Sequence, residues 1–270
     1  IHDIDESLNL GDVSKIENEK LPSDICILTH GSPCQDFSVS GERRGGDKNS
    51  GTRSSLMWET VRIISNTKPK IVVWENVKGV LNKSNKHNFE KYLNELEKMG
   101  YKNHFDTLNA INFGVPQNRE RVFVVSLLGD NYPNFKMPKG QSKTEKRFGD
   151  YIEKPTPEFA ILSEKIQKRL KIYDKPKGII IGTTAPPQRS VGQRDRVYSL
   201  SGYMATLTAT EYKQPKQILQ DGVVRKITPL ECWRLMGFPD DDFNKVKRLK
   251  HSNTTLYKQA GNSICVNVLE

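Results

Sequence analysis

Apolar runs alternate with amphipathic stretches over the first half of the chain. Short apolar runs that end in polar residues occur at 24–30 (DICILTH), 70–76 (KIVVWEN) and 121–127 (RVFVVSL), a pattern typical of buried strands. Residues 54–67 and 88–100 place apolar side chains at helical spacing, and the second stretch ends in a glycine, a common helix stop. Strands and helices in alternation predict an α/β fold with a parallel sheet covered on both faces.

The pattern changes near Tyr132. Residues 131–143 are rich in Pro, Gly and Lys, which indicates a crossing between domains. Periodicity is weak beyond this point, and short β-like runs begin at Gly178, Arg196 and Met204. We therefore expect a second, small domain that is mostly irregular or β-structured.

Regular structure resumes in TPLECWRLMGFP. Thr228 is placed to cap a helix, Pro229 suits the first helical position, and Glu231 closes a capping box. Gly237 is the expected stop. The expected division of the chain is a first domain at 1–140, the small domain at 141–226, and a return to the first domain at 227–270.

The basic charge is concentrated in the small domain. The chain carries 42 Lys and Arg against 32 Asp and Glu, a net charge of +10. Residues 141–226 hold 17 basic and 9 acidic residues, so this segment alone contributes +8. A basic segment beside a nearly neutral one indicates a docking surface for nucleic acid, although a generally basic surface would give the same total.

The four cysteines, Cys26, Cys34, Cys232 and Cys265, are widely spaced. They form no CxxC pair and no metal-ligand spacing, which favours a reduced, cytoplasmic protein without a metal site. The sequence also contains no apolar run near the ~20 residues of a membrane span, so no membrane association is expected.

Two chemically interesting side chains follow predicted strands. Cys34 lies in the Gly-Ser-Pro loop after 24–30, and Glu75 ends the strand at 70–76. The carboxyl ends of parallel strands meet at one edge of a sheet, so both residues can share a cleft. A cysteine in such a turn has no core to fill and is a candidate thiolate nucleophile. The alternatives are a small buried cysteine and a solvated strand-end carboxylate.

Two further segments carry polar groups suited to a ligand. In GVPQNRERVFVV, Arg119 and Arg121 alternate on one side of an extended segment, where two guanidiniums can bind a carboxylate, a phosphate or a base edge. A salt-bridged entry to a strand explains the same pattern. The segment QAGNSI (259–264) offers amide and hydroxyl groups, or it is simply the start of a helix.

Together these segments resemble, in order, the signature blocks of the DNA cytosine-5 methyltransferase family. The blocks are GSPCQDFSVSG (31–41), WENV (74–77), QNRERVF (117–123), TPLECWRLMGFP (228–239) and QAGNS (259–263). The resemblance runs from Gly11 to the C-terminus, except for about 141–190, where the family diverges. It implies a Rossmann-like, S-adenosylmethionine-dependent methyltransferase sheet with a small target-recognition domain.

The resemblance also implies catalytic roles by position. Cys34 resembles the nucleophile that adds to C6 of cytosine, and Glu75 the acid that contacts N3 and the exocyclic amine. Arg121 resembles the residue that holds the base oxygen, and Arg119 lies beside the active centre. Because the target atoms are out of reach in a stacked duplex, the base must be flipped out.

The cofactor and DNA contacts follow in the same way. Asp12, in LNLGDVSKI, resembles the acidic contact to the adenine of S-adenosylmethionine. The other residues matching the cofactor pocket are Pro33, Leu56 and Asn262, although Leu56 also suits a core. The residues matching DNA contacts are Gln35, Ser38, Ser40, Gln193, Tyr198 and Thr206. The last three fall in GQRDRVYSLSGYMATLTA (192–209), which resembles the target-recognition signature.

The chain departs from the family at its start. The glycine-rich first block and the acidic residue that binds the ribose have no counterpart here, so the chain begins between the second and third family blocks. A further N-terminal segment, a second polypeptide carrying these strands, or a truncated relic would each explain this, and the first is favoured. The main expectation is a monomeric enzyme acting on double-stranded DNA. The alternative is a catalytically inactive or split DNA-binding homologue, and a Cys–His hydrolase using His30 is disfavoured.

Overall fold

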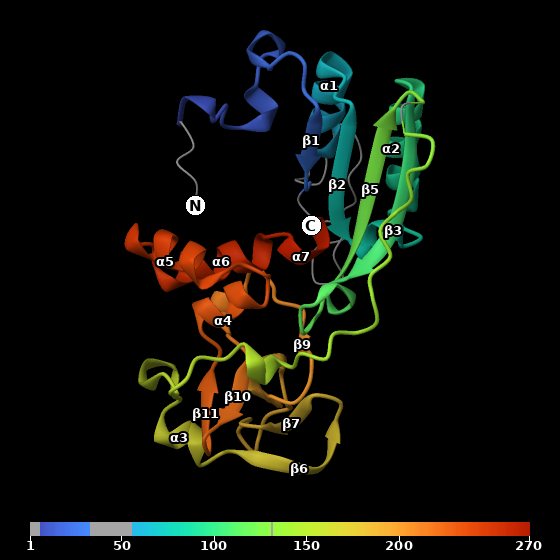
Figure 1. The fold of residues 1–270 in the computed structure, drawn as a ribbon. Coiled ribbons are helices and arrows are strands. Elements are labelled where there is room, and N and C mark those ends of the chain that lie inside the picture. The colour runs from blue at the N-terminus through green and yellow to red at the C-terminus, as the bar shows by residue number, and fades with distance from the viewer. Residues whose placement is uncertain (1–5, 33–55, 131) are drawn as a thin grey trace. The chain divides into compact units, whose positions relative to one another are not determined.

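The structure, a computed structural model, describes residues 6–32, 56–130 and 132–270 (Figure 1). Contacts divide the chain into two compact units. The N-terminal unit comprises His2–Leu108 and Glu120–Lys139, and the C-terminal unit comprises Asn109–Arg119 and Gly140–Glu270. Each unit has its own sheet and its own hydrophobic core.

The N-terminal unit is built on a four-stranded sheet with the order β1-β2-β5-β3. Its strands are β1 (Ile27–His30), β2 (Ile71–Val77), β3 (Tyr101–Asn109) and β5 (Glu120–Leu128). The three apolar runs are strands as expected, but the sheet is not all parallel. β1 and β2 are parallel, whereas β2 and β5 are antiparallel. Only a 3-10 turn at 110–113 and a two-residue strand separate β3 from β5, and a parallel return requires a longer crossover.

Two helices, α1 (Met57–Thr67) and α2 (Lys86–Lys98), join these strands, as the apolar spacing predicts. Their apolar sides pack with β2 and β5 into one cluster that includes Met57, Tyr92 and Trp74, all fully buried. Gly100 follows α2 with a φ of 94°, a conformation that suits a residue without a side chain. The short 3-10 turns of this unit are η1 (Glu6–Leu8), η2 (Val13–Lys15), η3 (Asn18–Lys20) and η5 (Lys78–Leu81).

The C-terminal unit contains a five-stranded sheet with the order β11-β10-β8-β7-β6 and a two-stranded pair, β4 with β9. The strands are β4 (Gln117–Asn118), β6 (Lys171–Lys177), β7 (Ile180–Thr183), β8 (Arg196–Tyr198), β9 (Met204–Ala205), β10 (Gln217–Gln220) and β11 (Val223–Lys226). Its 3-10 turns are η6 (Ala110–Phe113), η7 (Phe148–Asp150), η8 (Glu158–Ala160), η9 (Gln193–Asp195) and η10 (Glu211–Lys213). The β-like runs predicted from the sequence coincide with β7, β8 and β9.

Five helices complete this unit: α3 (Glu164–Gln167), α4 (Pro229–Arg234), α5 (Asp240–Arg248), α6 (Asn253–Asn262) and α7 (Val266–Leu269). The predicted capping box of α4 is present, with Thr228 as the cap and Glu231 bonding back to its amide. One core cluster joins Tyr198 and Ile218 of the sheet to Trp233 and Leu256 of the helices. Residues 227–270 therefore group with the small domain by contacts, and their expected assignment to the first domain stays a prediction.

The described residues include neither a membrane-spanning helix nor a metal-ligating cluster. None of the helices described combines the length and apolar character that a bilayer crossing requires. Within 6–32, 56–130 and 132–270, no three His, Cys, Asp or Glu side chains are grouped so as to hold a metal ion.

Candidate active site

An acidic and a basic side chain meet where β2 ends and β5 begins. Arg121 Nε lies 3.0 Å from Glu75 Oε1, and the two side chains are only 16% and 14% exposed. The antiparallel register pairs Val77 with Arg121, which places Glu75 two residues along β2 on the same face as Arg121. The sheet therefore holds a carboxylate and a guanidinium together in a partly dehydrated position.

The chain that leads toward Cys34 is attached beside this pair. A Cβ on Gly31 would lie 3.6 Å from Glu75 Oε2, so the backbone passes directly against the carboxylate. Trp74 Nε1 donates to Ser32 Oγ at 3.2 Å, and Asn76 Nδ2 donates to the same oxygen at 3.0 Å and to the Ser32 carbonyl. Two residues of β2 that flank Glu75 thus fix the last described position before the Cys34 loop.

The loop itself lies outside the described residues. This applies to Cys34 and to the predicted cofactor and DNA contacts Pro33, Gln35, Ser38 and Ser40. Their roles stay predictions. The other three cysteines are unpaired thiols: Cys26 is exposed, and Cys232 and Cys265 are buried.

His30, the last residue of β1, packs against Trp74 and Tyr92 of the same unit. His30 Nε2 lies 2.9 Å from the Tyr92 hydroxyl, and its ring stacks on Trp74 with a centroid distance of 5.9 Å. Its Nδ1 is enclosed and has no hydrogen-bond partner among the described residues. Burial lowers the pKa of His30 to about 3, so the ring is neutral at physiological pH. The disfavoured Cys–His hydrolase was the only role that the sequence suggested for His30, and its contact with Tyr92 was not predicted because the two residues lie 62 positions apart.

The predicted adenine contact lies on an exposed turn. Asp12 caps η2, and its carboxylate accepts hydrogen bonds from the Ser14 amide at 3.0 Å and the Ser14 hydroxyl at 2.8 Å. These hydrogen bonds lower the pKa of Asp12, so an ionised acceptor faces solvent. Arg62 of α1 donates to the carbonyls of Val13 and Ile16, at 3.3 and 3.0 Å, and so ties this turn to α1.

Leu56, another predicted cofactor residue, immediately precedes α1 and is half-buried. Arg62 of the same helix holds the turn that contains Asp12. Adenine is a flat ring that carries an amine, so an ionised acceptor and a half-buried leucine are side chains of the kinds that fit the adenosine end of S-adenosylmethionine. The role of Arg62 was not predicted from the sequence, although its place on the polar face of α1 could have indicated a contact outside the helix.

Arg119 is buried and contacts the main chain of the C-terminal unit. It is 4% exposed, and its guanidinium donates to three main-chain carbonyls, those of Leu207, Gly261 and Ser263, at 2.9, 3.2 and 2.8 Å. It connects two segments of the C-terminal unit that are far apart in sequence. Arg119 therefore links these segments internally, and its expected place beside the active centre, next to Arg121, stays a prediction. Asn262, the remaining predicted cofactor residue, is exposed at the end of α6.

The predicted DNA contacts in the C-terminal unit differ in exposure. Gln193 begins η9 and is exposed, which leaves its side chain available. Thr206 is half-buried and donates to the Asn118 carbonyl at 2.6 Å. Tyr198 is 5% exposed and packs within the main core of the unit. The expectation of a DNA contact through Tyr198 is corrected, because its ring is part of the core.

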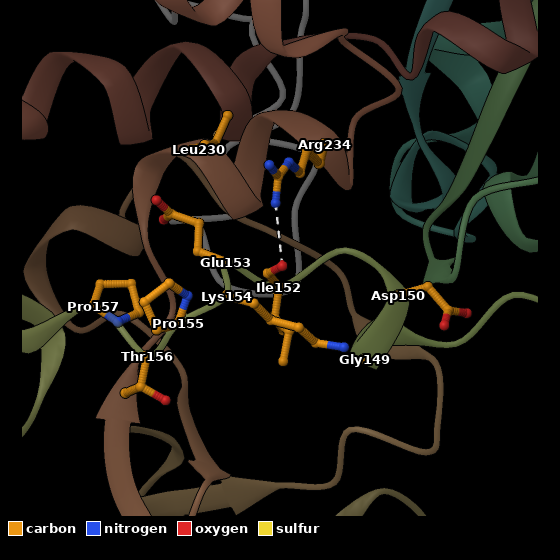
Figure 2. A pocket seen from close by; sticks show the side chains of 10 residues that line it. All are labelled: Gly149, Asp150, Ile152, Glu153, Lys154, Pro155, Thr156, Pro157, Leu230 and Arg234. Atoms are coloured by element: carbon orange, nitrogen blue, oxygen red, sulfur yellow. Dashed lines mark hydrogen bonds between the residues drawn. The ribbon is translucent and has the colours of Figure 1, made fainter.

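A cavity of about 640 Å³ lies between residues 149–157 and α4 (Figure 2). Arg234 points into the group of side chains drawn there, donates to the carbonyls of Tyr151 and Ile152, and pairs with Asp240 at 2.6 Å. Its cation is therefore satisfied within the protein. None of the residues proposed for catalysis, cofactor or DNA lines this cavity.

Comparisons with known proteins identify the family of the chain. The chain matches the model of the C-5 cytosine-specific DNA methylases over residues 2–270. It is 40% identical to the type II methyltransferase M2.ScrFI of Lactococcus lactis subsp. cremoris, over 97% of this chain and 69% of that protein. It is 33% identical to the type II methyltransferase M.HhaI of Haemophilus parahaemolyticus, over 96% of this chain and 78% of that protein.

Solved structures show the same fold at lower identity. The Entamoeba histolytica methyltransferase EhMeth superposes with a TM-score of 0.69 at 17% identity, covering 96% of this chain and 79% of that one. The S. pombe Dnmt2 methyltransferase superposes with a TM-score of 0.66 at 19% identity, covering 96% and 80%. With a family match over nearly its whole length, the chain belongs to the C-5 cytosine-specific DNA methylases.

Proposed function

We propose that this methyltransferase transfers a methyl group from S-adenosylmethionine to C5 of a flipped-out cytosine in duplex DNA, through a covalent bond between Cys34 and C6. The observation that carries the proposal is the Glu75–Arg121 pair, held beside the backbone that leads to Cys34. This arrangement places a negatively charged acceptor, Glu75, beside a positively charged donor, Arg121, where β2 ends and β5 begins.

The pair matches the edge of a cytosine. That edge presents two neighbouring acceptors, O2 and N3, followed by the N4 amine. Arg121 donates to O2, while Glu75 takes up a proton from solvent as its ion pair with Arg121 opens, donates this proton to N3 and accepts from N4. In the free enzyme the two side chains bond to each other at 3.0 Å, so the base replaces one ion pair with contacts to both partners.

Glu75 then prevents charge from accumulating on the ring. The Cys34 thiolate forms a bond to C6, the C5–C6 π pair becomes a C4–C5 double bond, and the C4–N3 π pair moves to N3, where it takes the Glu75 proton. The resulting enamine carbon C5 is nucleophilic enough to take the methyl group from the sulfonium, which leaves as a neutral thioether. Water accepts the C5 proton, N3 returns its proton to Glu75, and Cys34 leaves C6 as the thiolate, which restores the aromatic ring.

S-adenosylmethionine, when bound, supplies the electrophilic methyl group. Asp12 accepts a hydrogen bond from the adenine amine, and Leu56 contacts the ring. Arg62 acts indirectly by fixing the turn on which Asp12 lies. Pro33 and Asn262 complete the proposed cofactor contacts.

The DNA contacts proposed for the loop residues are Gln35, Ser38 and Ser40. In the C-terminal unit, exposed Gln193 is proposed to fill the space that the flipped base leaves. Thr206, through its bond to Asn118, is proposed to set the position of the recognition segment. We propose that the enzyme acts as a monomer in the cytoplasm, which fits the unpaired thiols among its described cysteines.

Methyl transfer to duplex DNA tests the proposal. Cys34→Ser is expected to abolish transfer of labelled methyl groups from S-adenosylmethionine while leaving DNA binding intact. Cys26→Ser is the matched control, because it removes an exposed thiol on the same strand-loop segment and should leave transfer unchanged. Methylation by the Cys34→Ser enzyme would overturn the covalent route. An inactive DNA-binding homologue is not favoured by the comparisons, and binding of S-adenosylmethionine, measured by calorimetry, would argue further against it.

A further inference from the structure

A concave surface lies at one end of the five-stranded sheet in the C-terminal unit. Its volume is about 780 Å³. The walls come mainly from β6, the edge strand of the sheet, with Ile180 of β7, Arg196 of β8 and Val191 from the segment between them. β6 lies within about 141–190, the part of the chain that the resemblance to the family's signature blocks does not cover.

The lining is strongly basic. It contains Lys171, Lys175, Lys177 and Arg196 against a single carboxylate, Asp174. Within the described residues, none of the four cations is within ion-pair distance of an acidic group, whereas Lys168 of the preceding turn pairs with Glu164 at 2.6 Å. Cations that line a concavity without internal partners keep their charge available for an anionic partner.

Apolar side chains lie among these cations. Ile172 and Val191 are 47% and 44% exposed, and Tyr173 is half-buried in the same lining. A small inorganic anion would gain nothing from such contacts. The combination of spaced cations and exposed apolar groups suits a chain of phosphates separated by sugars.

The position of the cavity relative to the recognition segment points to the same ligand. Val191 and Arg196 flank η9, which carries Gln193. This turn is held rigidly, because buried Asp195 accepts from the Gly192 amide at 3.0 Å and pairs with Arg189 at 2.6 Å. A backbone seated on β6 would therefore lie next to the segment expected to read the target.

We infer that the concave surface lined by β6, Val191 and Arg196, here called the β6 groove, binds the phosphodiester backbone of the duplex beside the target sequence. This inference rests on the proposed function. Lysine and proline on an edge strand also discourage pairing with another sheet, but that role explains neither Arg196 on the interior strand β8 nor the exposed Ile172.

The test is the salt dependence of DNA binding by the full chain. The triple variant Lys171→Gln/Lys175→Gln/Lys177→Gln is expected to lower the slope of log affinity against log salt by about 0.9 per lysine that contacts a phosphate. Its apparent Kd should rise roughly tenfold or more at low salt. KM for DNA should rise in parallel, with kcat at saturating DNA unchanged. Asp174→Asn should act in the opposite direction and tighten binding.

A matched control removes the same charge elsewhere. Lys86→Gln/Lys91→Gln/Lys98→Gln changes three lysines of α2 and is expected to leave the slope near the wild-type value. The inference would be overturned if the slope of log affinity against log salt were the same for the groove variant and this control. It would also be overturned if the groove variant formed higher oligomers and kept its DNA affinity. Failure of the proposed function is separate: it would show as no methyl transfer by the wild type, even if the slopes still differ between variants.

Discussion

Glu75 Oε1 and Arg121 Nε lie 3.0 Å apart across two antiparallel strands. Backbone pairing of β2 with β5 fixes both residues before any substrate arrives. In the proposed mechanism these two side chains contact adjacent atoms of one base, so the sheet register pre-organises base recognition. Ser32, bonded to Trp74 and Asn76, fixes the chain just before the segment that contains Cys34.

Glu75→Gln is predicted to lower kcat by about 10²–10⁴-fold with little effect on DNA affinity, because an amide cannot deliver the proton that N3 needs. Single-turnover methyl transfer measures this directly. Glu120→Gln is the control, since Glu120 precedes Arg121 but forms an exposed pair with Lys78. Equal losses in the two variants would show that Glu75 only supports the local structure.

Arg119→Met is predicted to destabilise the protein by about 3 kcal/mol or more, because it leaves the carbonyls of Leu207, Gly261 and Ser263 without their charged donor. The denaturant midpoint measures the effect. Arg248→Met, at an exposed helix end, should change it by less than about 0.5 kcal/mol. A large loss of kcat without loss of stability would instead place Arg119 among the base-contacting groups.

Substitutions in the buried Arg225–Glu231 pair are predicted to have non-additive effects on the free energy of unfolding. Arg225 and Glu231 are both fully buried and joined by two hydrogen bonds of 2.5 and 2.9 Å. Arg225→Met should lower the free energy of unfolding by about 3–5 kcal/mol, because it leaves the buried Glu231 carboxylate without its cation. Adding Glu231→Gln should recover at least about 1 kcal/mol, since the amide is neutral and still accepts from Thr228. A double variant less stable than Arg225→Met, measured by urea unfolding, would contradict this account.

His30 predicts a pH-dependent stability. Its pKa is 6.5 when unfolded and about 3 in the fold, because burial disfavours the charged ring. Between these values the unfolded chain binds more protons, so the stabilisation is complete above pH 6.5 and is lost as the pH falls toward 3. At pH 5 the loss is about 2 kcal/mol. His30→Gln should be less sensitive to the change from pH 7 to pH 5, and an equal drop in both proteins would refute the assignment.

The sequence predicts the regular elements that carry local signals. Helix α2 and the Thr228–Glu231 capping box follow from spacing and cap chemistry, and the structure confirms them. Strand β3 was missed because Tyr101–Asn109 has no apolar run and is exposed along much of its length. The reversal of β5 was also missed, since strand direction depends on the connection and not on the strand's own residues.

The candidate site was predicted only in part, because its contacts join residues that are far apart in the sequence. The order of the signature segments identified Glu75 and Arg121, but their ion pair follows from sheet register. Position in a signature did not reveal that Arg119 is an internal brace or that Tyr198 belongs to the core. Both outcomes depend on partners that fold in from distant parts of the chain.

Covalent trapping tests the central claim most directly. The enzyme is incubated with S-adenosylmethionine and duplex DNA that carries 5-fluorocytosine at the target, and adducts are detected by denaturing electrophoresis and intact mass. Fluorine cannot leave as the C5 proton does, so the wild type should accumulate a stable bond between Cys34 and C6, and Cys34→Ser should form none. Methylation of ordinary cytosine by an enzyme that never forms this adduct would contradict the account.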